Sequence, residues 1–114
     1  MTNLSDDAYG GFIVSKNVIV GRPIGYSFRE RAAQPQLNGW TLYSVDDDDQ
    51  YVNDPANFVI VGVTTLHARS PVMLELFDAP YGTDLQRQYT QGLLTGFWDL
   101  AGDQTVSIDQ LLRG

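Results

Sequence analysis

Four consecutive aspartates are the densest group of chemically active side chains in this chain. They are Asp46, Asp47, Asp48 and Asp49. Clustered carboxylate oxygens suit calcium, and the usual twelve-residue calcium loop has glycine at its sixth position and glutamate at its twelfth. Counted from Asp46, those positions hold Tyr51 and Asn57, so the spacing predicts no calcium site. Two alternatives remain for the run: a short helix capped by Asp46, whose dipole favours anions in the first turn, or a contact with a cationic partner.

Other catalytic groups are scarce. The chain has no cysteine, so it has no disulfide and no thiolate nucleophile or metal ligand. His67 is the only histidine, and no nucleophile or second metal ligand accompanies it, so we expect a surface or boundary residue. Gly21 and Gly25 lack the spacing and the Lys-Ser/Thr ending of a phosphate loop. We predict no catalytic residue, no metal and no cofactor.

The charge balance fits a basic protein partner and, equally well, a role in solubility alone. The net charge is -7, and residues 38–114 hold eleven of the 14 acidic side chains but three of the seven basic ones. Such a surface repels phosphate backbones, which argues against nucleic acid and is compatible with a basic protein. No apolar run approaches the ~18 residues of a membrane span, and no basic, apolar leader opens the sequence. We therefore expect a cytoplasmic protein that does not bind membranes.

Hydrophobic patterning predicts five strands. Residues 24–29 alternate between apolar and polar with the period of a half-buried strand, which would place Arg29 in solvent. Residues 40–45 and 58–63 are rich in aromatic and β-branched side chains. Residues 12–15 and 18–20 look like a hairpin that turns at Lys16 and Asn17.

Three helices are predicted in the second half of the chain. The first spans residues 70–78, with Ser70 as N-cap and Pro71 at the first helical position. Residues 83–86 and 107–110 have the capping-box form that opens a helix. Residues 93–100 fit a strand and a loop equally well.

These elements predict an α+β fold. We expect a single domain with a mainly antiparallel sheet of about five strands and short helices packed on one face. The predicted core is Phe12, Val14, Tyr26, Phe28, Trp40, Leu42, Phe58, Ile60, Leu74 and Phe77.

Several short motifs occur in an order that resembles a known family. They are Gly11-Phe12-Ile13-Val14-Ser15-Lys16, Gly25-Tyr26, Arg29-Glu30, Gly39-Trp40, Tyr51 with Asp54-Pro55 and Asn57, Pro71 to Leu76, and Ala79-Pro80-Tyr81-Gly82. Together they resemble bacterial immunity proteins of polymorphic toxin systems, in particular immunity family thirty-three, earlier catalogued as a domain of unknown function. The resemblance implies an immunity-like α+β domain over residues 10–88, preceded by a lead of residues 1–9. Residues 89–114 match no part of the pattern, and we expect them to form a C-terminal extension docked on the same domain.

The resemblance implies a non-enzymatic module that binds and neutralises a cognate toxin. We expect the four aspartates, together with Trp40, Tyr43 and Tyr51, to contact this partner, because aromatic side chains commonly anchor interfaces. The alternative is an accessory or self-associating structural domain, and the sequence leaves the oligomeric state open.

Overall fold

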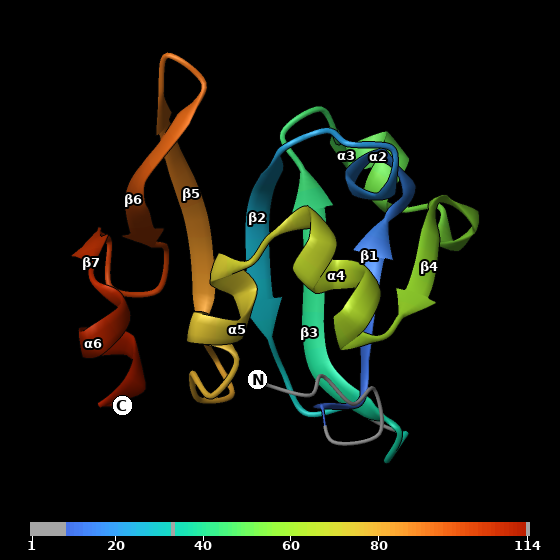
Figure 1. The fold of residues 1–114 in the computed structure, drawn as a ribbon, viewed down its shortest axis with the longest axis horizontal. Coiled ribbons are helices and arrows are strands. Elements are labelled where there is room, and N and C mark those ends of the chain that lie inside the picture. The colour runs from blue at the N-terminus through green and yellow to red at the C-terminus, as the bar shows by residue number, and fades with distance from the viewer. Residues whose placement is uncertain (1–8, 33, 114) are drawn as a thin grey trace.

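One mixed sheet forms the framework of the molecule (Figure 1). The computed structural model describes residues 9–32 and 34–113, and within them seven strands lie in the order β4-β1-β3-β2-β5-β6-β7. The strands are β1 (Gly11–Ser15), β2 (Ile24–Arg29), β3 (Leu37–Ser44), β4 (Phe58–Val61), β5 (Asp84–Thr90), β6 (Leu93–Asp99) and β7 (Gln104–Val106). The predicted count of about five was too low, because residues 84–106 add three strands.

The sheet is antiparallel except at β1. Val14 of β1 lies opposite Leu42 in the parallel pair with β3, and opposite Val59 in the antiparallel pair with β4. The strands on either side of the acidic run are therefore separated by β1 and do not pair with each other. The last strands are joined tightly, because Gln91 and Gly92 both have positive φ and connect β5 to β6 in a two-residue turn.

The predicted hairpin after β1 was wrong. Residues 16–19 form helix α2 (Lys16–Ile19), and the Ser15 hydroxyl accepts a hydrogen bond from the Asn17 amide at 3.2 Å to cap it. The helix places Val18 in the core with 1% of its surface exposed. A short cap followed by β-branched residues gave a misleading strand pattern.

The remaining helices are short. They are α3 (Asp49–Val52), the 3-10 turn η1 (Pro55–Asn57), α4 (Val63–Arg69), α5 (Val72–Leu76) and α6 (Ile108–Leu112). The α6 capping box is confirmed, since the Ser107 hydroxyl accepts from the Gln110 amide at 3.2 Å and the Gln110 side chain accepts from the Ser107 amide at 2.8 Å. Within the described ranges, no helix is long and apolar enough to cross a membrane.

The helix predicted at residues 83–86 was wrong, because these residues lead into β5. The helix predicted after Ser70 is present as α5, but its N-cap is Pro71 rather than Ser70, with no side-chain capping bond. Helix α4 was not predicted, because Val63, Thr64 and Thr65 have low helix propensity and continue an apolar strand.

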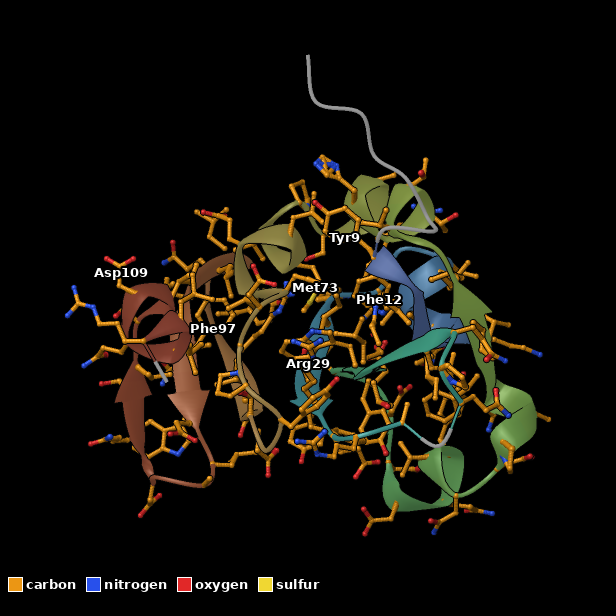
Figure 2. All side chains as sticks on the ribbon, turned by 90° about the horizontal axis from the view of Figure 1, so that it is seen from below. Tyr9, Phe12, Arg29, Met73, Phe97 and Asp109 are labelled. Atoms are coloured by element: carbon orange, nitrogen blue, oxygen red, sulfur yellow. The ribbon has the colours of Figure 1, made fainter. Side chains whose placement is uncertain are left out.

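Helices α2, α4, α5 and α6 contribute buried side chains to one face of the sheet. Figure 2 shows α4 and α5 together on one side, with the labelled Met73 and Phe12 between helix and strand. The buried apolar side chains are Phe12, Val14, Val18, Ile24, Trp40, Leu42, Val63, Leu66, Met73, Leu76, Ala79, Leu85, Phe97 and Leu111.

The predicted core was correct for one face only. Phe12, Val14, Trp40 and Leu42 are fully buried. Leu74 and Phe77 are partly buried and pack against this core. The other predicted core residues, Tyr26, Phe28, Phe58 and Ile60, lie on the opposite face, where 62% of Ile60 is exposed.

Arg29 was predicted to face solvent, and this prediction was wrong. It lies on the covered face, where Nη1 donates to the carbonyl oxygens of Phe77 at 2.7 Å and Ala79 at 2.9 Å. Its Nε donates to the carbonyl oxygen of Asn38 at 3.1 Å. One side chain thus joins the end of α5 to β3.

Candidate functional site

The sheet face opposite these helices is aromatic and apolar, and we call it the open face. Its side chains are Ile13, Tyr26, Phe28, Thr41, Tyr43, Phe58 and Ile60. Alternation places them there, because the neighbouring residues Phe12, Val14, Trp40 and Leu42 point into the core. In Figure 2, α4 and α5 lie beyond the other side of the sheet, whereas α3, drawn in green, lies at one edge of this side.

The aromatic rings of the open face form a continuous band. Tyr43 is its centre, with ring centroids 5.4 Å from Tyr26, 5.6 Å from Phe28 and 5.5 Å from Phe58. Phe58 in turn lies 6.3 Å from Tyr51 of α3. These are normal spacings for packed aromatic pairs, so the band joins β2, β3, β4 and α3 into one platform.

Three adjoining hollows lie on this face. One of about 410 Å³ is lined by Tyr43 and three residues of the acidic run. A second of about 410 Å³ shares Tyr43 and adds Ile13, Thr41 and Ile60. A third of about 340 Å³ shares Ile13 and Thr41 with the second and reaches the loop that follows β2. Shared walls make the three hollows one grooved surface.

The acidic run lies at one end of this surface, and its four members differ in role. Asp46 pairs with Arg22, whose Nη2 donates to Oδ1 at 3.1 Å. Asp47 accepts from the Asn17 side chain at 2.8 Å and from the Ser44 amide at 2.8 Å. Both therefore hold neighbouring turns together.

Asp48 and Asp49 are the outward-facing pair. Asp48, rather than the predicted Asp46, caps α3, because its Oδ1 accepts from the Tyr51 amide at 2.8 Å. Asp49 lies in the first turn of α3, and both side chains are exposed along the first hollow. These two carboxylates are the part of the run best placed to meet a partner.

The tyrosines of the open face keep their protons at neutral pH. Burial raises the pKa of Tyr43, and the nearby carboxylates of Glu30 and Asp47 raise it further. Burial also raises the pKa of Tyr26, and its hydrogen bond with Asp84 adds to the shift. Both hydroxyl groups therefore remain neutral hydrogen-bond donors and acceptors.

The predicted partner contacts separate into two sets. Tyr43 and Tyr51 belong to the aromatic band at the acidic end, whereas Trp40 is fully buried on the covered face and its Nε1 donates to the Phe77 carbonyl at 3.1 Å. Trp40 is therefore left out of the site. Sequence reasoning missed Tyr26 and Phe28, although their alternation in residues 24–29 had already placed them on one face.

Two further observations concern catalytic and metal-binding groups. His67 is partly buried on α4, as expected of a boundary residue. Among the residues that the structure describes, no group of three or more His, Asp or Glu is placed to hold a metal ion. The distinctive feature of the described structure is therefore the grooved aromatic surface of the open face.

Comparison with known proteins gives one match. The family described as the immunity protein Imm33 domain matches residues 12–95, which include every side chain of the open face. No curated protein and no solved structure matches the chain.

Proposed function

The chain belongs to the Imm33 immunity protein family, and from this premise we propose that it is a non-enzymatic binding module whose open face covers and neutralises a partner toxin. The observation that carries the proposal is the grooved aromatic band, which no helix of residues 9–32 and 34–113 covers. Contiguous exposed apolar surface marks interaction sites, and aromatic side chains near the centre of an interface supply much of its binding energy. Tyr43 occupies that central position.

The negative charge of the chain supports a partner with a cationic surface. The chain carries a net charge of -7, and the exposed carboxylates of Asp48 and Asp49 flank the first hollow. Toxins that attack nucleic acid need cationic clefts for phosphate, and opposite charge speeds encounter with such a surface. The proposed partner is therefore a basic toxin domain, bound with the acidic end of the open face towards its cleft.

The test uses the toxin domain that the proposal expects to be encoded beside this gene. Ile60→Arg places a cation on the open face, and Val20→Arg makes the same change on an aliphatic residue that is 75% exposed outside it. We expect Ile60→Arg to weaken toxin binding by about tenfold or more, measured by calorimetry, and to reduce protection of cells that express the toxin. Val20→Arg should bind and protect like the wild type. Equal binding by both variants would contradict the proposed face.

Self-association is the competing use of the same face. Two copies would bring two acidic runs into one assembly, and their repulsion opposes such pairing. Size-exclusion chromatography coupled to light scattering measures the oligomeric state and so distinguishes self-association from toxin binding. A dimer that Ile60→Arg dissociates would support the accessory, self-associating role, whereas a monomer that binds toxin supports the immunity role.

A further inference from the structure

A cavity on the helix-covered side of the sheet has basic walls. Its volume is about 190 Å³, and it lies between the turn before β2, the junction of α4 and α5, and β5. Arg22, Arg69, Ser70, Arg87 and Tyr89 line it, and its described lining residues include no carboxylate. Three arginines around a small cavity in an acidic protein call for an explanation.

Arg87 is a buried cation without an anionic partner in the described structure. Only 7% of its surface is exposed, and its Nε is buried with no hydrogen-bond partner there. Its Nη2 lies 3.9 Å from the Met73 sulfur, and its guanidinium lies 5.9 Å from the Phe97 ring. Burial lowers the pKa of Arg87, and Tyr89, rather than a carboxylate, opposes this shift through its charge interaction and its hydrogen bond with the guanidinium. Guanidinium stays charged in proteins, so this burial is costly unless an anion offsets it.

A second buried polar group on the cavity wall also lacks a hydrogen-bond partner among the described residues. Ser70 is 5% exposed, and its Oγ has no hydrogen-bond partner in the described structure. The Tyr89 hydroxyl donates to the Ile24 carbonyl at 2.6 Å, which fixes the aromatic wall of the cavity. Buried polar atoms are normally paired. Two unpaired donors on the walls of one cavity indicate that an acceptor binds there.

We propose that this cavity binds a small oxyanion of the phosphate class. The fork of Arg87 and the hydroxyl of Ser70 donate to its oxygens, and Arg69 contributes positive charge at the exposed mouth. Arg22 contributes less, because its guanidinium pairs with Asp46. Arg87 also lines the first hollow, but its guanidinium lies beside Met73 on the covered face. The anion test uses no toxin, so its outcome does not depend on the toxin-binding proposal.

The experiment measures anion binding without any toxin. Thermal unfolding and calorimetry are recorded in sodium phosphate and in sodium chloride of equal ionic strength. The wild type should show a melting temperature that rises with the logarithm of phosphate concentration beyond the effect of chloride. Arg87→Met should weaken phosphate binding by about tenfold or more, and Ser70→Ala by about threefold to tenfold. The control Arg113→Met removes one cation at the end of α6 and should bind phosphate as the wild type does.

Arg87→Met also tests the cost of the buried charge. Methionine fills the site beside Met73 and Phe97, so without phosphate this variant should melt at or above the wild-type temperature. If it fails to fold, Ser70→Ala carries the binding test alone. Tighter binding of a nucleoside monophosphate than of inorganic phosphate would identify the oxyanion as part of a larger molecule, and equal binding would identify the free ion. The absence of a phosphate-specific shift in the wild type, or the same shift in both pocket variants, would refute the site.

Discussion

Arg29 links the helical layer to the sheet through both charge and hydrogen bonds. Its guanidinium lies 4.8 Å from the Tyr81 ring and 5.1 Å from the Phe77 ring, while its donors reach three carbonyl oxygens. The sequence predicted the opposite orientation because Tyr26 and Phe28 were assigned to the core. Arg29 does alternate with Phe28 along the strand, but the helices cover the face of Arg29 rather than that of Phe28.

Replacing Arg29 should destabilise the fold strongly. Arg29→Met should lower the free energy of unfolding by ~2–4 kcal/mol, because it leaves the Ala79 carbonyl without its donor in a buried setting. Urea denaturation measures the change. The matched control is Arg31→Met, an exposed cation 4.8 Å from the same Tyr81 ring, which should cost less than ~1 kcal/mol. Equal losses in the two variants would show that the hydrogen bonds of Arg29 contribute nothing beyond its ring contacts.

The Arg22–Asp46 pair should make stability depend on pH in the acid range. The hydrogen bond from Arg22 holds the pKa of Asp46 below its ordinary value of 3.8. A carboxyl group with a lowered folded-state pKa stabilises the protein above its unfolded pKa, and this contribution is lost as the pH falls through the folded pKa. Asp46→Asn should therefore be less stable than the wild type at pH 7, and the difference should disappear at strongly acidic pH. A difference that stays constant across urea titrations at both pH values would point to a cause other than ionisation.

At the scale of elements, α5 contacts the core through one side. Leu76 is fully buried, whereas Leu74 is only partly buried at the edge of the core. Leu76→Ala should therefore cost ~2–5 kcal/mol in the free energy of unfolding, and Leu74→Ala about half as much. Denaturant titration of the two variants compares them directly. A larger loss for Leu74→Ala would mean that α5 packs with a different side towards the sheet.

The local patterns predicted some elements and misled in others for physical reasons. The capping box at Ser107 is confirmed by both of its hydrogen bonds, and α6 needs only one apolar side, anchored by Leu111. The same pattern at Thr83 failed because Leu85 is fully buried within a strand, and tertiary burial overrides local propensity. The parallel pair of β1 and β3 has no local signal at all.

The candidate site was predictable only in part. The aspartate run and the aromatic content of residues 40–45 drew attention to the end of the molecule where the open face meets the acidic run. Alternation assigns Trp40 and Tyr43 to opposite faces of β3, but it does not reveal which face the helices cover. That choice depends on α4, which the sequence reading missed, and so Trp40 was taken for a contact and Phe28 for core.

At the scale of the whole molecule, charge should control how fast the proposed toxin binds. Asp48→Asn combined with Asp49→Asn keeps a capping side chain on α3 and removes two exposed anions. We expect association to slow by about threefold to tenfold and its dependence on salt to weaken, with little change in dissociation. Stopped-flow mixing at two salt concentrations measures both rates.

The matched control removes two anions elsewhere. Asp103→Asn combined with Asp109→Asn alters the turn before β7 and the first turn of α6, far along the sheet from α3 (Figure 1). If both double variants slow association equally, net charge alone steers the encounter. A selective effect of Asp48 and Asp49 instead assigns the steering to the acidic end of the open face.

The position of β1 affects how the protein is made in the cell. Its sheet partners are residues 37–42 of β3 and 58–61 of β4, so β1 is synthesised well before either strand with which it pairs. The ribosome must release residue 61 before β1 is flanked on both edges, and until then Phe12 and Val14 stay exposed to other nascent chains and to chaperones. At typical elongation rates of roughly 5–20 residues per second, this vulnerable period lasts on the order of seconds. Translation speed over the codons for residues 15–61 therefore sets how long β1 is open to aggregation.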